Sequence, residues 1–279
     1  LKSINKNNPG LDLEIIIIDN DSKEKETHAF LNSINNIRTA IYSIKVIRVR
    51  GAFNYSSLNN KAFRYSTGNV ILLLNNDVEF ITPKWGELLA SNALRNGIGC
   101  VGCKLFFEDY SIQHAGVILG ISGIAGHAHK FFPYENKGYQ SRIQLTQEFS
   151  AVTGACLALS RENWIKLKGL NENSLKVNYN DVDLCLRSHE SGFRNIYLPF
   201  IEGIHQESST RGRLKSLYFK QWKKEIHWVK HKWRDVLLKG DSYYNPNLTL
   251  LNEEFSFSIN PKNENIFKPR NGQIKSFNQ

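Results

Sequence analysis

The chain has 279 residues, 41% of them hydrophobic and 11% aromatic, which suits one large globular domain or two small ones. No apolar run approaches the roughly 20 residues that a membrane-spanning helix needs. The formal net charge is +10, and the positive excess is heaviest after Arg211. This charge favours an acidic partner, such as a nucleic acid, an anionic membrane surface or a phosphorylated substrate.

The four cysteines, Cys100, Cys103, Cys156 and Cys185, are too few for a disulfide scaffold in a chain of this length. Cys100 and Cys103 have the spacing of a metal or redox motif, but they lie in an apolar, strand-like run and no second pair exists. The sequence therefore predicts buried free thiols in a reducing compartment. No signal-peptide pattern is present at the start. The sequence also contains no methionine, so we expect a fragment or a processed piece.

The first third of the chain alternates strand and helix patterns. Short apolar runs predict buried strands over residues 13–18 and 70–74, and a further strand is predicted over 44–49. One helix is predicted from about Lys23, capped by Ser22 or Asp21, and another over residues 61–66. This order is typical of a parallel sheet with crossover helices.

Polar clusters follow two of these strands. Asp19 to Ser22 ends the first, and Asn75-Asn76-Asp77 ends the third. In open α/β sheets, ligands bind at the carboxyl ends of the strands. The Asp77 carboxylate, flanked by short polar side chains, can hold a divalent cation and through it a diphosphate. The alternative is a simple polar turn, because Asn and Asp favour turns.

The middle of the chain is less regular. A helix is predicted to begin at residues 82–85, with Pro83 in its first turn, and a strand to cover 99–106. Residues 113–130 are rich in glycine and read as a flexible loop. His127 and His129 have the spacing of metal ligands on a strand, but a polar loop face is the competing interpretation.

A strand is predicted over residues 150–159, where Gly154 indicates that a ligand or another backbone approaches closely. Further on, Asn180 is the expected cap of a helix that carries Asp181 and Asp183 in its first turn. Asp183 and Arg187 are four residues apart and can pair. Two acidic residues exceed what the helix dipole requires, and Asp181 is the one left without a structural reason.

Residues 214–238 combine tryptophans with many lysines and arginines and predict a basic amphipathic helix, broken or continuous. Docking on a membrane surface is one interpretation, and packing of the aromatic face on the domain is the other, which we favour. Residues 241–279 lack periodicity, and we expect the end of the chain to be disordered.

Taken together, six motifs resemble bacterial family 2 glycosyltransferases of the GT-A fold, in the branch labelled rhamnosyltransferase-like. The resemblance covers roughly residues 10–250, with the motifs in the family's order. The motifs are Ile-Ile-Ile-Asp19-Asn-Asp-Ser, Phe53-Asn54-Tyr-Ser-Ser-Leu-Asn59-Asn60, Leu-Leu-Leu-Asn75-Asn76-Asp77-Val-Glu79, Ala151-Val-Thr-Gly154-Ala-Cys, Asn180-Asp181-Val-Asp183-Leu-Cys-Leu-Arg187 and His205-Gln-Glu-Ser-Ser-Thr-Arg211-Gly.

The resemblance implies a Rossmann-like, mostly parallel sheet flanked by helices, with a C-terminal helical extension. It implies a glycosyltransferase domain over 1–212, the basic helical extension over 213–250 and an irregular tail over 251–279. Asp181 would be the catalytic base, and Asp77 and His205 the metal ligands. Asp19, Asn54, Asn59 and Asn76 would bind the nucleotide sugar. His127, His129, Gly154 and Asp183 would border the acceptor.

The implied reaction is inverting transfer of a sugar, with dTDP-rhamnose as the donor that the branch suggests. A Mn²⁺ or Mg²⁺ ion would stabilise the leaving diphosphate, since oxygen-rich ligation with one imidazole suits these metals. The acceptor would be a glycan or a lipid-linked sugar in cell-surface polysaccharide synthesis. The enzyme would then be cytoplasmic, with contact to the inner face of the plasma membrane.

One departure from the family pattern concerns the beginning of the chain. Family members open with a strand and a short nucleotide-contacting loop, and this sequence starts after them. Two other interpretations, one based on this departure and one on the charge and the tryptophans of the basic segment, stay open. One is an inactive glycosyltransferase fragment. The other is a protein that binds nucleic acid or an anionic surface, although the basic residues form no known nucleic-acid motif.

Overall fold

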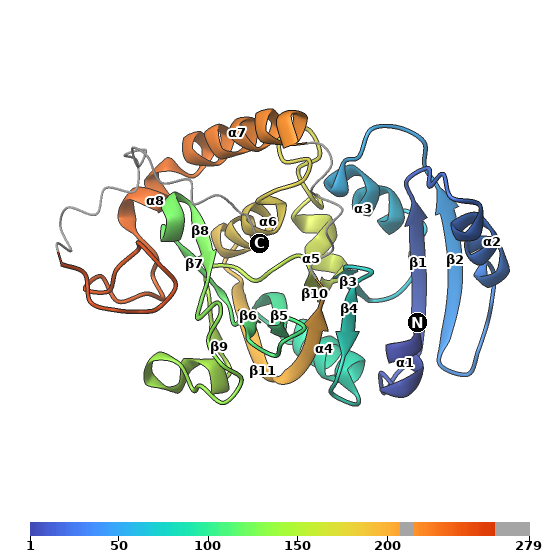
Figure 1. Cartoon of the computed structure of the whole chain (residues 1–279), viewed down its shortest axis with the longest axis horizontal. Helices are drawn as coiled ribbons and strands as arrows, with labels where there is room; N and C mark the ends of the chain where they lie inside the picture. Colours follow the sequence, from blue (N-terminus) through green and yellow to red (C-terminus); the bar gives the residue numbers. More distant parts are fainter. Residues whose placement is uncertain (207–214, 260–279) are drawn as a thin grey trace.

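The computed structural model describes residues 1–206 and 215–259, with side-chain positions from residue 219 onward in the second range. The predicted polar segment 207–212 and the predicted disordered end, 260–279, lie outside these residues. Figure 1 shows a central sheet flanked by helices, with the N-terminal elements at one end of the molecule.

The central sheet is mixed rather than mostly parallel. Among the described strands of this sheet, only β5 and β11 pair in parallel, and β10 runs antiparallel to both of its neighbours. In spatial order the strands are β3 (Val70–Leu74), β10 (Cys156–Ser160), β5 (Ile98–Phe106), β11 (Arg194–His205) and β4 (Val78–Phe80), with β6 (Ile112–His114) beside β5 and β9 (Gln147–Glu148) beside β11.

Both faces of this sheet are covered. Along β10, Leu157 and Leu159 point into one apolar cluster, while Cys156 and Ala158 point into another. This alternation follows from the period of two residues in a strand. The first cluster lies under α5 (Arg161–Lys166), α6 (Asn180–Glu190), α7 (Lys215–Lys232) and α8 (Arg234–Lys239), and the second under α1 (Lys2–Lys6) and α4 (Trp85–Ala93).

The first two predicted strands form a separate parallel sheet of β1 (Leu13–Asp19) and β2 (Tyr42–Arg48), next to α2 (Lys25–Ile34). Their positions confirm the prediction. Their burial does not, because Ile15 to Ile18 are only half-buried. Within the described residues β1 pairs with β2 alone, so one of its edges lacks a hydrogen-bonded strand.

Several helix beginnings differ from the prediction. The helix α3 (Tyr55–Phe63) starts at the Asn54 cap, well before residue 61. Lys84 and Tyr179, both in the left-handed region (φ 57° and 58°), precede α4 and α6. Asn180 is therefore the first residue of α6 and not its cap. Similarly, α2 begins after Glu24, so neither Asp21 nor Ser22 caps it.

The glycine-rich region is more ordered than a flexible loop. Besides β6 it contains a hairpin of β7 (Val117–Leu119) and β8 (Ala125–His127), joined through η1 (Ile121–Gly123). A further short helix, η2 (Tyr139–Gln144), follows. Of the predicted strand over 150–159, only the part from Cys156 is a strand, and residues 152–155 form a bend before it.

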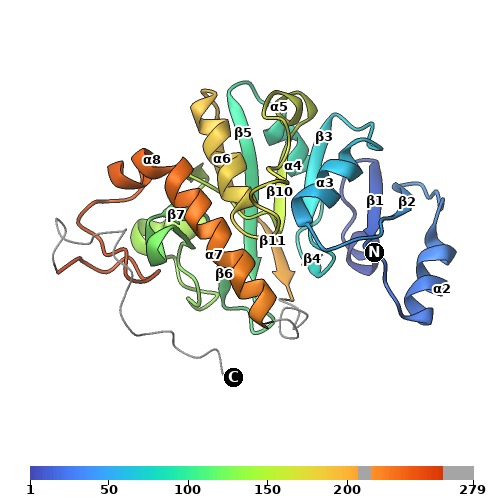
Figure 2. The ribbon, with the colours of Figure 1, turned by 90° about the horizontal axis from the view of Figure 1, so that it is seen from above.

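The C-terminal helices pack on the domain through their apolar face. Val229, Trp233 and Leu237 are each only 1% exposed and join the same cluster as α6. This confirms packing of the aromatic face. The helix is broken at Trp233, between α7 and α8, and Figure 2 shows α7 lying alongside α6. No helix in the described ranges is both long and apolar enough to cross a bilayer.

Two further predictions concern burial. All four cysteines are buried and unpaired, as expected of free thiols. Residues 241–259 lack helices and strands, as predicted, but they are not loosely attached. Tyr244, Leu248 and Phe255 are buried in a third apolar cluster with Ile118 and Phe149.

Candidate functional site

Asp77 and His205 meet where β4 and β11 pair. His205 ends β11 opposite Val78, which directly follows Asp77. The His205 Nε2 atom lies 3.1 Å from Asp77 Oδ1 and 3.2 Å from Asn75 Nδ2. Asp77 Oδ1 is buried, and no group in the described part of the chain donates a hydrogen bond to it. A buried carboxylate oxygen without a donor is costly, so this corner favours a cation.

Gln113 of β6 lies behind His205. Its Oε1 atom is 2.6 Å from His205 Nδ1, and its Nε2 donates to the His205 carbonyl oxygen at 3.2 Å. The main-chain oxygen of Gln113 lies 3.1 Å from Nδ1 of His127. Gln113 therefore contacts both histidines, although it was not among the residues predicted from the sequence. Its signal is a long polar side chain in a short, fully buried strand, between Ile112 and His114.

Asp181, at the start of α6, accepts two backbone hydrogen bonds. Gly154 N–H donates to its Oδ2 and Val182 N–H to its Oδ1, both at 2.8 Å. The Tyr55 hydroxyl donates to the Gly154 carbonyl oxygen at 2.9 Å. Burial and the nearby charge of Asp181 raise the pKa of Tyr55. Tyr55 was not predicted as a site residue, although it lies within the motif that contains Asn54 and Asn59.

The bend before β10 connects these two groups. Ala155 accepts a hydrogen bond from Asn75 N–H at 2.9 Å, while its neighbour Gly154 binds Asp181. A side chain at position 154 would place its Cβ 3.3 Å from the Asp181 Cβ, a tighter contact than most. The atoms that approach Gly154 closely are thus side-chain atoms of Asp181 and Tyr55, whereas the sequence predicted a ligand or another backbone. Residues 154 and 155 thus link Asp181 to Asn75, which contacts His205 at the corner formed by Asp77 and His205.

The loop before α6 is held by a buried residue of α7. Glu225, fully buried, accepts backbone hydrogen bonds from Lys176, Val177 and Asn178 at 2.8–3.0 Å. The Asn178 side chain and Gln221 donate to the same carboxylate. Asp181 follows three residues later. The position of Asp181 therefore depends on a helix in the C-terminal part of the chain.

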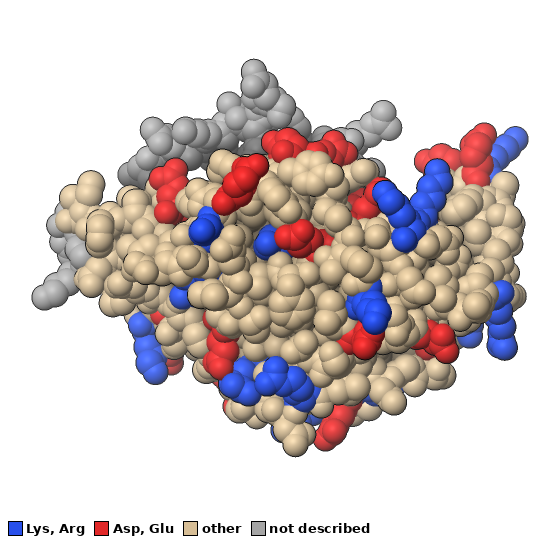
Figure 3. All heavy atoms as spheres, turned by 90° about the horizontal axis from the view of Figure 1, so that it is seen from below, with Lys and Arg blue, Asp and Glu red and all other residues tan. Residues whose placement is uncertain are grey.

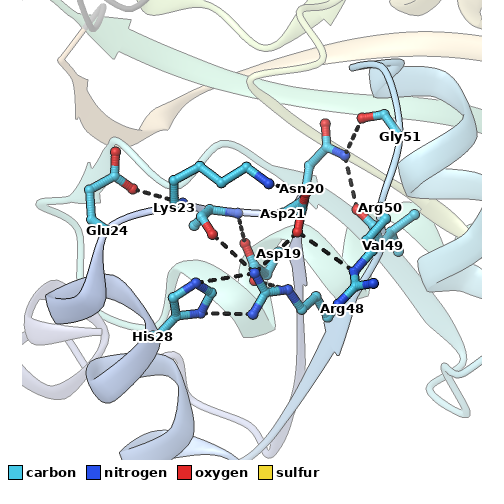
Figure 4. Close-up of polar contacts among 11 residues, drawn as sticks. Asp19, Asn20, Asp21, Lys23, Glu24, His28, Arg48, Val49, Arg50 and Gly51 are labelled. Atoms are coloured by element: carbon cyan, nitrogen blue, oxygen red, sulfur yellow. Dashed lines mark hydrogen bonds and ion pairs between the residues drawn. The ribbon is translucent and has the colours of Figure 1, made fainter.

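Asp19 belongs to a separate polar cluster at the ends of β1 and β2 (Figure 4). Ser22 N–H donates to Asp19 Oδ1 at 2.9 Å, and Arg48 Nε lies 3.6 Å from Oδ2. Burial raises the pKa of Asp19, but the hydrogen bonds from Ser22 and the charge of Arg48 outweigh it and leave the pKa below its usual range. Arg48 also contacts His28 and Asp21, so the Asp19 carboxylate is held ionised in a fixed orientation.

The predicted asparagines have different surroundings. Asn54 caps α3 by accepting from Ser57 N–H, and its amide donates to the Glu172 carbonyl oxygen at 3.0 Å. Asn59 donates to the Tyr55 carbonyl oxygen within the same helix at 2.8 Å. Asn76 is exposed beside Asp77. Of these three asparagines, only Asn76 is classed as exposed, next to the corner formed by Asp77 and His205.

The two histidines predicted at the acceptor side separate. The His127 Nδ1 atom lies 3.2 Å from Nδ1 of the buried His114, next to Gln113 and His205. Burial and the charge of Lys130 lower the pKa of His127 to about 4, so this ring is neutral. His129 instead stacks on Phe255 at 4.0 Å and accepts from Tyr139 N–H. The structure brings His127, but not His129, to the site.

Asp183 also lies away from the site. It is 1% exposed, and its two oxygens accept from Arg187 Nε at 2.8 Å and from Trp233 Nε1 at 3.1 Å. The predicted pair with Arg187 is therefore confirmed. The acceptor-side position is not, because successive residues of a helix point in different directions and Asp183 faces the core under α8.

The fold is of the GT-A type found in glycosyltransferases. The structure is similar to that of GalNAc-T7 with UDP, GalNAc and Mn²⁺, with a TM-score of 0.57 and 15% identity, over 74% of this chain and 41% of that one. The chain belongs to glycosyl transferase family 2, whose model matches residues 1–163.

Two relatives are similar over most of the chain. The uncharacterized protein y4gI of Sinorhizobium fredii (strain NBRC 101917 / NGR234) is 40% identical over 88% of this chain. The O-antigen biosynthesis protein RfbC of Myxococcus xanthus is 35% identical over 85% of it. The chain spans only 27% and 18%, respectively, of the lengths of these relatives.

Proposed function

We propose that the chain is an inverting glycosyltransferase of the rhamnosyltransferase-like branch, which moves a sugar from a nucleotide-sugar donor to a glycan or lipid-linked acceptor. The donor-side diphosphate would bind at Asp77 and His205, and Asp181 would accept the proton of the attacking hydroxyl. The observation that carries the proposal is the convergence of Asp77 Oδ1 and His205 Nε2 on one buried corner.

The residues at this corner fit a divalent cation. Two ligands at neighbouring corners of an octahedral site, with bonds of about 2.1 Å, lie about 3 Å apart. The 3.1 Å between Asp77 Oδ1 and His205 Nε2 agrees with this. In the described residues no group of three or more His, Cys, Asp or Glu side chains can hold a metal, so this pair would be completed by the diphosphate and water. A bound Mn²⁺ or Mg²⁺ would stabilise the charge on the leaving diphosphate.

Asp181 suits the role of general base. Two backbone N–H groups hold its carboxylate in one orientation, and a carboxylate fixed in this way can take a proton from a hydroxyl placed next to it. As an acceptor hydroxyl attacks the anomeric carbon from the side opposite the diphosphate, its proton would pass to this carboxylate. Attack from that side inverts the anomeric configuration.

The donor and the pathway are proposed on separate grounds. The fixed, ionised Asp19 suits an N–H group of a nucleotide base or a ribose hydroxyl. The branch suggests dTDP-rhamnose, with UDP- and GDP-sugars as alternatives. The similarity to an O-antigen biosynthesis protein supports an acceptor in cell-surface polysaccharide synthesis.

Calorimetric titration of UDP, dTDP and GDP, each with and without Mn²⁺, tests the proposal. We expect one nucleotide to bind in a Mn²⁺-dependent manner, because the cation would link its diphosphate to Asp77. The Asp19→Asn variant should weaken the binding of that nucleotide, while Asp109→Asn, a change at an exposed surface acid, should not. If none of the three nucleotides binds in the presence or absence of Mn²⁺, this chain does not hold the donor as proposed.

We also propose that the enzyme works in the cytoplasm at the inner face of the plasma membrane. Between residues 219 and 234, α7 and the start of α8 expose basic side chains and no acidic one. The exposed basic residues are Lys220, Lys223, Lys224, Lys232 and Arg234, together with His227 and His231. On the face seen in Figure 3, by contrast, Lys and Arg are interspersed with Asp and Glu. Because Val229 of α7 is buried and most of the exposed residues of this helix are basic, the contact would be electrostatic rather than inserted.

Sedimentation with vesicles tests this contact. Binding to vesicles that contain phosphatidylserine is expected to weaken as the salt concentration rises. Binding should also weaken in the double variant Lys223→Glu, Lys224→Glu, by about 1 kcal/mol for each lysine near the surface. The control is Lys2→Glu, Lys6→Glu, which changes the net charge equally on exposed lysines of α1. Equal loss in both double variants would assign the effect to net charge and not to α7.

A further inference from the structure

Gln113 makes two hydrogen bonds with a single residue, His205. It is 5% exposed and His205 is 8% exposed. The amide nitrogen of Gln113 faces the His205 carbonyl oxygen at 3.2 Å, and its amide oxygen faces the ring nitrogen Nδ1 at 2.6 Å. Since a carbonyl oxygen can only accept, the donor contact fixes which end of the Gln113 amide is nitrogen. Its Oε1 atom therefore points at the imidazole.

This orientation decides where the imidazole carries its proton. Oε1 has no hydrogen, so a contact of 2.6 Å with Nδ1 requires that Nδ1 carries one and donates it. In the neutral ring the other nitrogen, Nε2, is then an acceptor with a lone pair. That atom faces the Asn75 amide, which can donate to it, and the Asp77 carboxylate. An unprotonated Nε2 beside a carboxylate is the form that binds a metal ion.

We propose that Gln113 is a positioning residue, which holds His205 as the Nδ1–H tautomer and thereby presents Nε2 to a divalent cation at Asp77. The proposal rests on the metal site of the proposed function. Outer hydrogen bonds of this kind orient metal-binding histidines, and their loss costs 10- to 100-fold in metal affinity in other proteins. Gln113 also holds His127 through its backbone oxygen, a contact that no substitution of its side chain removes.

The test uses ¹⁵N-histidine NMR on the metal-free protein, followed by Mn²⁺ titration by EPR in the presence of the bound nucleotide. The His205 signals are assigned by their loss in His205→Ala. In wild type, Nδ1 should be protonated and Nε2 unprotonated. Gln113→Leu should lose this preference and bind Mn²⁺ about 10- to 100-fold more weakly. Gln113→Glu keeps an acceptor for Nδ1–H, so it should retain the tautomer.

The control is Asn163→Leu, which also removes a buried amide bonded to a backbone carbonyl, that of Ile98. Ile98 is at the opposite end of β5 from Phe106, which pairs with Ile204 beside His205. This variant should lose thermal stability but keep both the His205 tautomer and the Mn²⁺ affinity. It therefore separates an effect of lost stability from an effect on the imidazole.

The two readouts keep this proposal apart from the proposed function. An unchanged His205 tautomer in Gln113→Leu, or a wild-type His205 protonated on Nε2, would overturn the role of Gln113 whatever the metal does. If the His205 tautomer changes as expected in Gln113→Leu but the wild-type protein binds no Mn²⁺, the result would instead refute the metal site. If Gln113→Leu does not fold, loss of the tautomer in the folded Gln113→Glu variant would equally overturn the proposal.

Discussion

Asp181→Asn is expected to lower the rate constant for sugar transfer by about 10²- to 10⁴-fold, the usual contribution of a general base, while the affinity for the nucleotide stays within about twofold. The amide cannot accept the proton of the incoming hydroxyl, but it preserves the size of the side chain. Transfer is measured with a labelled donor and an acceptor extract, and affinity by calorimetry.

Glu190→Gln supplies the matched control, since Glu190 is an exposed acid at the other end of the same helix. It should transfer sugar at the wild-type rate. The Asp181 carboxylate accepts hydrogen bonds from two N–H groups, and the amide introduced by Asp181→Asn can accept only one of these bonds. The melting temperature of each variant therefore has to be recorded. Loss of nucleotide binding together with transfer would show that Asp181 supports the Gly154 bend instead of acting as the base.

Asp77→Asn should abolish Mn²⁺-dependent nucleotide binding and lower transfer by about a thousandfold, because the charge that holds the cation is removed. The metal-free protein should not lose stability. Asp77 Oδ1 is buried without a hydrogen-bond donor among the described residues, so the folded state gains little from its charge. Calorimetry, transfer assays and thermal melting in a chelator measure the three effects.

The neighbouring Glu79→Gln is the control for this variant, because Glu79 is an exposed acid in β4, two residues further on. It should bind the nucleotide and Mn²⁺ like the wild type. A metal-free Asp77→Asn protein that melts well below wild type would argue that Asp77 pairs with a protonated His205 for structural reasons. Retained Mn²⁺ dependence would place the cation elsewhere.

Much of the fold could be predicted because its strands are short apolar runs. β1, β2 and β3 lie within two residues of their predicted bounds. Helix beginnings were harder, since Lys84 and Tyr179 precede helices in left-handed conformations that neither residue type favours. The antiparallel insertion of β10 between β3 and β5 also has no local signal. It depends on pairing between distant segments.

The site shows the same division. The carboxylates of Asp77 and Asp181 stand out in the sequence as acids at element ends. The contacts around them do not, because Gly154 N–H reaches Asp181, Gln113 reaches His205 and Tyr55 reaches Gly154 across 27 to 99 positions of the chain. His129 and Asp183 show the opposite error. The spacing of His129 from His127 and the family resemblance for Asp183 suggested acceptor-side roles, but His129 stacks on Phe255 and Asp183 bonds to Arg187 and Trp233.

The buried Glu225 has a consequence for how members of this family can diverge. It lies in α7, beyond the part that the family model matches, yet it holds the loop that leads to Asp181. The exposed lysines of the same helix are free to vary with the surroundings in which the protein works. The outer face of α7 can therefore change in evolution, or when the helix is exchanged between relatives by engineering. The inner face, which carries Glu225, has to be kept.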